Sequence, residues 1–232
     1  CQIVSANTFN KCLYRVNSKY NLGISATPER KDGMTKILYL HLGKVFHKEK
    51  VERANQRLLV HFHDLSFTYS NVANYTQMIN LMSEHGERNR IVLNETIKIA
   101  SDPLRRILVL SQRRNQAEWL CNQLSETTQR TVGLIIAGVK KVESQLACDI
   151  ICSTFQSFSV GISVNELNTL VLTVASSDVT QPLGRILRKT HVDVEPLVID
   201  FVDKHLMRGK FNRLATYKKE LNGNVHVTTM TH

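Results

Sequence analysis

Short apolar runs alternate with segments of helical periodicity along most of the chain, and this alternation constrains the fold more than any other feature. The runs expected to form strands are 57–65, 107–110, 132–136, 149–153, 168–174 and 196–201. The helices expected between them cover 73–85, 88–100, 140–147, 179–189 and 207–221, and a further helix presents Ala117, Leu120, Cys121 and Leu124 on one side. Strands that alternate with helices form parallel sheets covered on both faces, so the sequence predicts an α/β fold.

The beginning of the chain carries one short apolar run. A helix is expected over 8–19, and Leu22, Ile24 and Ala26 then alternate as in a buried strand. Pro28 cannot continue a central ladder, so this strand must end there. Hydroxyl-bearing and charged residues follow the run. They lie at the end of a strand, where open α/β sheets place ligands. An ordinary polar turn is the alternative.

A second helix is expected before a linker. Its stop signal is Gly43, and its apolar face consists of Met34, Ile37, Leu38 and Leu42. Residues 44–56 are rich in charge and poor in periodicity. We therefore expect two domains, 1–48 and 49–232.

Charge and composition limit the classes of partner. Thirty Lys and Arg against twenty Asp and Glu give a net charge of +10, which favours a nucleic acid. Aromatic residues make up only 6%, so contacts to phosphates are expected rather than base stacking. The five cysteines form no C-x-x-C pair and His61 and His63 are isolated, so we expect structural thiols and no metal site. No apolar run approaches the ~18 residues that would span a membrane.

Polar side chains follow the expected strands directly. Ser111 and Arg113 come after one strand, and Thr154 and Gln156 come after another. The carboxyl ends of parallel strands meet at one edge, so these side chains are expected to lie near each other and to bind a phosphodiester backbone. For Ser111 and Ser153 the alternative is helix capping.

The segment from Gln181 to Arg188 is more specific. Arg185 and Arg188 are three residues apart and are expected on one helical face, while Gly184 lets another surface come close. Two converging guanidinium groups can stabilise a transferring phosphoryl group, an effect worth about 10³–10⁵ in rate. A solvated basic helix face is the alternative.

Taken in order, these segments resemble the motifs of superfamily 2 helicases. The stretch GISATPERKDG is similar to motif III, ILVLSQRR to motif IV, DIICSTFQSFSVGI to motif V and QPLGRILR to motif VI. PLVIDFVD and ATYKK also resemble the end of the second RecA-like domain. The likeness is to the branch of phage and large-DNA-virus helicases, nearest to that of African swine fever virus, which is akin to the poxvirus transcript-release helicase.

The resemblance implies a RecA-like second helicase lobe at 49–232, preceded by the end of the first lobe at 1–48, its partner in the same protein. It implies ATP with Mg²⁺ as cofactor and DNA or RNA as the other partner. It also implies an intracellular protein, in the host cytoplasm or the virion if the chain is viral, with no membrane partner. The implied site residues are Ser25 and Thr27 for coupling, Ser111, Arg113, Thr154 and Gln156 for the nucleic-acid backbone, Gly161 and Ser163 for the nucleotide, and Gln181, Arg185 and Arg188 for catalysis, with Arg188 as the arginine finger.

The chain departs from the family pattern in two ways. The branch has Glu-Gly-x-Asp in motif V, and here Val160 and Ser163 replace the two acids. No G-K-[ST] and no Asp-Glu dipeptide occur, so the phosphate loop and the Mg²⁺ ligands are missing. Family order places the Asp-Glu box just before Cys1. We therefore expect the C-terminal part of a helicase that hydrolyses no ATP alone.

Two other functions stay open. A non-enzymatic nucleic-acid-binding module with degenerate ATP handling would bind with steep salt dependence and would show no ATPase at full length. A scaffold whose basic face meets an acidic protein would bind no nucleic acid even at low salt.

Overall fold

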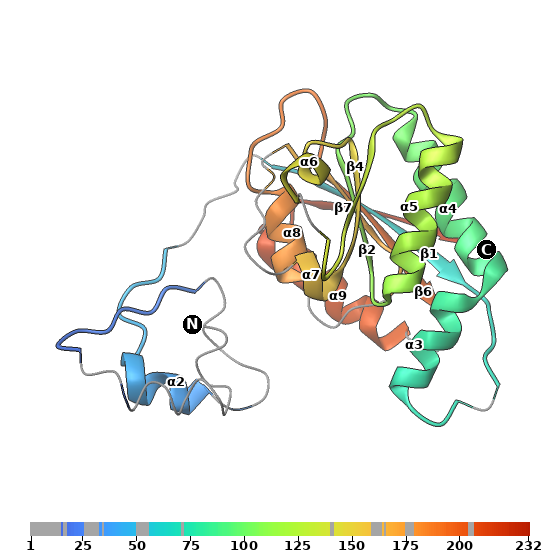
Figure 1. Ribbon diagram of the computed structural model, residues 1–232. Coiled ribbons are helices and arrows are strands. Elements are labelled where there is room, and N and C mark those ends of the chain that lie inside the picture. Colours follow the sequence, from blue (N-terminus) through green and yellow to red (C-terminus); the bar gives the residue numbers. More distant parts are fainter. Residues whose placement is uncertain are drawn as a thin grey trace. The chain divides into compact units, whose positions relative to one another are not determined.

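The computed structural model describes residues 15, 18–25, 33, 35–49, 56–70, 72–139, 142–158, 164, 166–174, 179–203 and 207–232 (Figure 1). The chain divides into two compact units, Cys1–Glu52 and Arg53–His232. This division falls close to the predicted boundary after residue 48. No helix among the described residues is long and apolar enough to cross a membrane.

A parallel seven-stranded sheet forms the centre of the second unit, in the order β3-β4-β2-β5-β6-β1-β7. The strands are β1 (Leu58–Leu65), β2 (Ile107–Ser111), β3 (Val132–Ile135), β4 (Ile150–Thr154), β5 (Thr169–Leu172), β6 (Leu197–Asp203) and β7 (Val225–Thr231). The predicted α/β class and the parallel sheet are therefore confirmed. Non-sequential neighbours in the sheet are joined through helical crossovers, as parallel pairing requires.

Helices cover both faces of this sheet. They are α3 (Tyr75–Glu84), α4 (Gly86–Ala100), α5 (Arg114–Thr127), α6 (Val142–Leu146), α7 (Phe155–Phe158), α8 (Thr180–Ile186) and α9 (Met207–Glu220). In Figure 1, α3, α4 and α5 lie to the right of the sheet, and α7, α8 and α9 lie to its left. The helices were expected from their periodicity, except for the single turn of α7.

The core has two layers because strand side chains alternate between the faces. On β2, Leu108 and Leu110 pack toward α8 and α9, whereas Ile107 and Val109 pack toward α4 and α5. All four of these side chains are at most 1% exposed. Burial on both faces explains why β2 is a continuous apolar run, and each buried Leu or Ile contributes about 1.5–3 kcal/mol.

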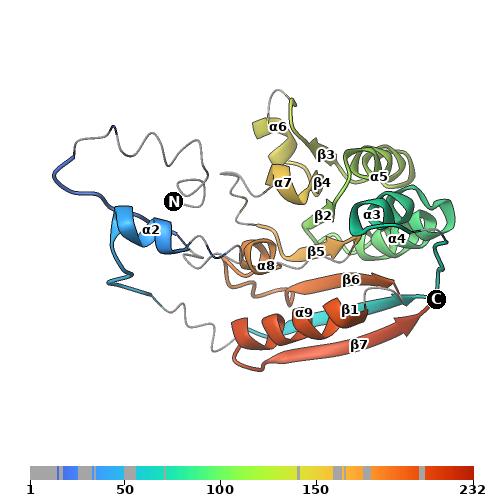
Figure 2. The same ribbon diagram turned by 90° about the horizontal axis from the view of Figure 1, so that it is seen from below.

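Strand β7 was not predicted. It is the last strand of the sheet, pairs in parallel with β1 and is mostly exposed (Figure 2). A turn in which Asn222 and Gly223 have φ values of 50° and 87° leads into it. Its sequence, VHVTTMT, has no apolar run because an edge strand needs little burial.

The first unit confirms one predicted element and contradicts another. Helix α2 (Thr35–Leu42) buries Leu38, and Gly43 ends it with a φ of 77° and an N–H bond to the carbonyl of Tyr39 at 3.0 Å. The strand predicted at Leu22 and Ile24 is wrong, since residues 21–25 have no regular structure and these two side chains are 70% and 80% exposed. A strand becomes buried only by pairing within a sheet, and the sheet belongs to the other unit.

Several predicted features of the first unit lie outside the described residues. They are Ala26, Thr27, Pro28, Met34 and most of the helix expected at 8–19. Ser18 and Lys19, at the end of that expected helix, are not helical.

Candidate functional site

Ser111 closes β2 and shapes the turn into α5. Its side chain is fully buried. Its hydroxyl accepts the backbone N–H of Arg113 at 3.0 Å and donates to Oε1 of Gln116 at 2.6 Å. Helix capping, the alternative for Ser111, is not observed, because the N-cap residue of α5 is Arg113 and no side chain caps the helix. The buried hydroxyl instead holds the turn before the helix.

Gln116 joins this turn to two other elements. Its Oε1 also accepts the hydroxyl of Thr173 at 3.0 Å, and its Nε2 donates to Oδ1 of Asn89 at 2.7 Å. Asn89 in turn donates to the carbonyl of Ser83 at 2.7 Å. This buried network fixes the exits of β2 and β5 against α4. Sequence reasoning missed it because glutamine and asparagine on a helix usually indicate a solvated face.

Arg113 lies at the same exit and is held by α3. Its Nε donates to Oδ1 of Asn80 at 2.5 Å, and its Nη2 donates to the carbonyl of Thr76 at 3.3 Å. The guanidinium is half-buried, so an incoming phosphate would compete with Asn80 for it. The charge is nevertheless placed at the carboxyl end of the sheet, as predicted.

Thr154 and Gln156 follow β4 on the neighbouring strand. The Thr154 hydroxyl accepts the N–H of Ser157 at 3.2 Å and donates to the Ser157 hydroxyl at 2.9 Å, which opens the turn of α7. The side chain of Gln156 is exposed. Ser111 and Thr154 are register partners on β2 and β4, so the fold brings the two predicted polar exits together.

The arginine segment differs from the prediction in one respect. Gln181 and Arg185 lie on α8, but the helix ends at Ile186, and Arg188 lies in the turn beyond the capping residue Leu187. Leu187 has a φ of −102° and a ψ of 6°, which leaves the helical region. The prediction that both arginines share one helical face is therefore wrong.

The two guanidinium groups are nonetheless close enough to interact. Partial burial lowers the pKa of Arg185, and the charge of Arg188 lowers it further. Cζ of Arg185 lies 5.8 Å from the ring centroid of Phe158, which is a cation–π distance. A methyl group added at Gly184 would meet nothing within 4 Å. An arginine pair beside open space suits an anionic ligand.

The described structure does not test the remaining predicted site residues. Thr27, Gly161 and Ser163 lie outside the described residues. Ser25 is half-buried within the first unit.

Comparison with curated proteins finds viral proteins assigned as helicases. The chain is 31% identical over 220 residues to a protein of Acanthamoeba polyphaga mimivirus assigned as an ATP-dependent RNA helicase, covering 86% of the chain and 41% of that protein. It is 26% identical over 247 residues to a protein of Invertebrate iridescent virus 6 assigned as a helicase, covering 94% and 53%. The chain is therefore similar to viral proteins assigned as helicases. It spans about half the length of the curated relatives it matches, and no family model matches it.

Solved structures agree with this at the level of the helicase fold. T4 UvsW aligns with a TM-score of 0.60 at 20% identity over 85% of the chain and 45% of that structure. S. cerevisiae Dbp5 bound to RNA and ADP BeF3 aligns with a TM-score of 0.56 at 13% identity over 99% and 56%. The Arg53–His232 unit thus has the fold of a RecA-like helicase lobe. The nearer likeness to the African swine fever virus helicase stays a prediction.

Two buried ion pairs brace the Arg53–His232 unit, and neither was predicted from the sequence. Arg213 on α9 binds Asp200 on β6 through Nε at 2.6 Å, and the Tyr217 hydroxyl donates to the same carboxylate at 3.0 Å. Burial raises the pKa of Asp200, and the charge of Arg213 opposes the rise. The second pair, Arg88–Asp203, lies at the carboxyl end of β6. Both aspartates stand within an apolar strand, where a partner is needed to offset desolvation.

Proposed function

We propose that the chain is the C-terminal part of an ATP-dependent superfamily 2 helicase or translocase that serves viral transcription or genome processing. The observation that carries this proposal is the interacting pair Arg185 and Arg188 beside the open position at Gly184. It occurs on a helicase lobe whose relatives are viral proteins assigned as helicases. Such a protein would work in the host cytoplasm or the virion.

The residues of this lobe fit one side of an ATP site. Arg185 and Arg188 offer two permanent charges, and Gln181 adds an amide on the same helix as Arg185. ATP bound with Mg²⁺ supplies a phosphoryl group whose transfer builds negative charge, and fixed guanidinium groups stabilise that charge. Arg188 is exposed, so it is the residue proposed to reach the nucleotide. Gly161 and Ser163 are proposed to lie near its sugar.

The phosphate loop and the Mg²⁺ ligands would come from the first RecA-like lobe of the same protein. The sequence contains no G-K-[ST] and no Asp-Glu dipeptide. This chain alone is therefore proposed to hydrolyse no ATP. Ser25 and Thr27 are proposed to couple the closure of the two lobes to movement along the nucleic acid.

A nucleic-acid backbone is proposed to lie along the exits of β2 and β4. Arg113, Thr154 and Gln156 provide charge and hydrogen-bond donors there, and such groups contact phosphates without reading bases. Ser111 is proposed to act by positioning Arg113, since its hydroxyl is buried. The structure of Dbp5 contains bound RNA. The net charge of +10 on this chain suits DNA and RNA equally.

The test is nucleic-acid-stimulated ATPase of the full-length protein with Arg188→Ala. Turnover is expected to fall about 10³-fold or more, because the charge on the transferring group loses its partner. Nucleic-acid binding is expected to stay unchanged. Lys189→Ala removes the neighbouring exposed charge and serves as the matched control. Normal nucleic-acid-stimulated turnover in Arg188→Ala would contradict the assignment of Arg188 as the arginine finger.

A second candidate is a nucleic-acid-binding module with degenerate ATP handling. The replacement of the motif V acids by Val160 and Ser163 favours it. A full-length protein that binds nucleic acid with steep salt dependence and has no ATPase under any condition would support this candidate and contradict the first.

A further inference from the structure

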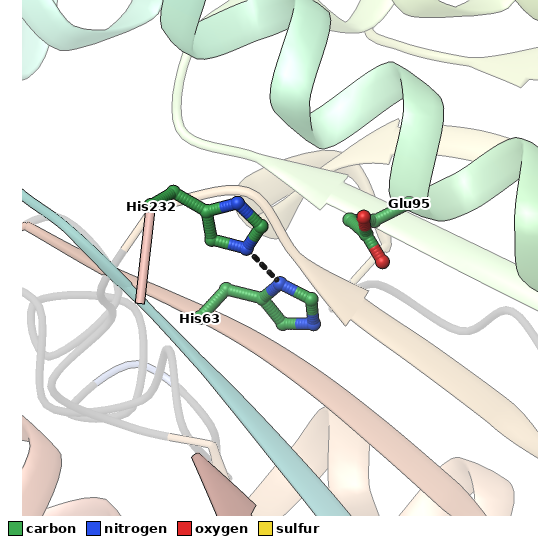
Figure 3. Close-up of side chains that lie close together, drawn as sticks. All are labelled: His63, Glu95 and His232. Carbon is green, nitrogen blue, oxygen red and sulfur yellow. Dashed lines mark hydrogen bonds between the residues drawn. The ribbon is translucent and has the colours of Figure 1, made fainter. Parts of the chain in front are cut away.

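Three side chains from distant parts of the sequence meet at the β1–β7 edge of the sheet. His63 lies on β1, Glu95 on α4, and His232 directly after β7 (Figure 3). Nδ1 of His63 and Nε2 of His232 are 2.8 Å apart, and one ligand atom from each of the three residues lies within 4.8 Å of the others. These three residues are called the edge cluster below.

Parallel pairing of β1 with β7 creates the cluster. Asp64 and Thr231 are register partners, so His232 arrives beside the end of β1, where its N–H donates to the carbonyl of Asp64 at 3.0 Å. The His63 ring packs against Phe201 with the ring centroids 4.9 Å apart. A packed ring has few accessible orientations, and the position of its nitrogens is therefore fixed before any ligand arrives.

The ligand atoms of the cluster suit a cation. Two imidazole nitrogens and one carboxylate oxygen lie within 4.8 Å of one another, which is a donor set that a metal ion can share. Glu95 is half-buried and supplies a carboxylate, whose present partner is Lys98 on the next turn. Lys98 has a 68% exposed side chain, so it can return to water without cost to the core.

We propose that the edge cluster binds one divalent transition-metal ion, with Zn²⁺ the best fit. Two imidazole nitrogens and one carboxylate oxygen are typical ligands of Zn²⁺, whereas Mg²⁺ and Ca²⁺ prefer oxygen alone. His232 is exposed, so the ion has a path from solvent and keeps a fourth position for water. The site is independent of the proposed ATP site.

Small side-chain movements are enough to form the site. A tetrahedral ion with bonds of about 2.0–2.2 Å holds its ligand atoms about 3.3–3.5 Å apart. The imidazole pair at 2.8 Å must open slightly, and the carboxylate must approach from within 4.8 Å. The exposed His232 and the half-buried Glu95 can both rotate. The ion then replaces the hydrogen bond between the two rings and ties the end of the edge strand to β1 and α4.

The experiment is calorimetric titration of the untagged 232-residue chain with Zn²⁺ near neutral pH, after removal of metal by a chelator. One equivalent is expected to bind and to raise the melting temperature, because the ion binds only the folded chain. His232→Ala and Glu95→Gln are expected to weaken binding about tenfold or more, since even the loss of a residue that only supports a ligand costs 10–100-fold. His226→Ala is the matched control, because it removes a histidine from the same strand and spares the cluster.

Co²⁺ gives a direct readout of coordination. The visible absorption of the Co²⁺-loaded chain is expected to show a tetrahedral site and to disappear in His232→Ala. The proposal is overturned if the wild-type chain binds no Zn²⁺, if His232→Ala binds as tightly as the wild type, or if His226→Ala weakens binding as much as His232→Ala. His63→Ala is not used because a buried ring would be lost from the core.

Discussion

Arg88 and Asp203 form an ion pair closed off from solvent, with Nη2 of Arg88 2.8 Å from Oδ2 of Asp203 and both side chains fully buried. The same Nη2 donates to the carbonyl of Thr173 at 2.6 Å, and the Tyr69 hydroxyl donates to Asp203 at 2.9 Å. One guanidinium therefore joins α4 to the ends of β5 and β6. The chain continues from the end of β5 to α8, which carries Arg185, so this pair braces the scaffold behind the proposed ATP site.

Breaking this pair from one side should destabilise the lobe strongly. Arg88→Met leaves a buried carboxylate without its cation and is expected to lower the free energy of unfolding by about 3–5 kcal/mol. The double variant Arg88→Met/Asp203→Leu is expected to lose less than the single one, because the stranded charge is gone. Urea denaturation measures both. Arg114→Met, which breaks the exposed pair with Glu118, is the control and should cost at most about 1 kcal/mol.

Asp149 should make stability depend on acid. Partial burial opposes its ionisation, but hydrogen bonds from Thr131, Arg130 and Arg106 favour the carboxylate and lower its pKa to about 2. The pKa of an aspartate in the unfolded chain is about 3.9. A lowered pKa in the folded chain therefore adds to the free energy of unfolding above that pH, and this contribution is lost as the pH falls toward 2. Asp149→Asn is expected to cost about 1 kcal/mol near neutral pH and much less at pH 2. The prediction is contradicted if the difference in free energy of unfolding between the wild type and Asp149→Asn stays the same as the pH is lowered.

The strands buried on both faces were the plainest in the sequence, although β1 and β3, which are only partly buried, were also predicted. Strands β2, β4, β5 and β6 are nearly continuous apolar runs, and such runs are visible in a single sequence. Strand β7 escaped prediction because an edge strand needs no such run. The end of α8 was misplaced because helical spacing continues through Arg188, while the backbone leaves the helix at Leu187.

The neighbouring positions of the polar strand ends could be predicted, and their hydrogen bonds could not. The polar exits of β2 and β4 could be found because parallel strands end at a common edge. The hydrogen bonds that occupy Ser111 and Arg113 could not, because Gln116 and Asn80 lie on helices whose packing depends on the whole fold. The edge cluster was invisible for the same reason, since His232 reaches His63 only through β-pairing across the length of the lobe.

Gln116 should matter for stability and not for ligand contact. Gln116→Ala leaves the buried polar groups of Asn89 and Thr173 without this partner, which is expected to cost about 1–3 kcal/mol for each group left unpaired. Thermal unfolding measures the loss. Gln123→Ala, two turns further along the same helix and less buried, is the control and should change little. Equal effects of the two variants would show that the network contributes nothing.

Arg113 should contribute one phosphate contact. Arg113→Ala is expected to weaken binding of single-stranded DNA or RNA without sequence preference and to reduce the salt slope of log K by about 1. Asn80→Ala removes the side chain that now holds the Arg113 Nε, so it is expected to leave binding unchanged or tighter. Fluorescence anisotropy at several salt concentrations measures both. An unchanged salt slope in Arg113→Ala would remove this residue from the interface.

Gly184 should separate stability from activity. A methyl group there meets nothing within 4 Å, and alanine is favoured over glycine inside a helix by about 0.5–1 kcal/mol, so Gly184→Ala is expected to stabilise the lobe. If the space beside Arg185 admits the nucleotide or the other lobe, the same methyl group should lower the ATPase of the full-length protein.

Gly86→Ala, at the start of α4, also meets open space and is the matched control for activity. Gly133→Ala would place a methyl group 2.5 Å from the carbonyl oxygen of Gln145 and should destabilise, which calibrates the unfolding assay. A Gly184→Ala protein that is both more stable and fully active would mean that nothing approaches α8 at this position.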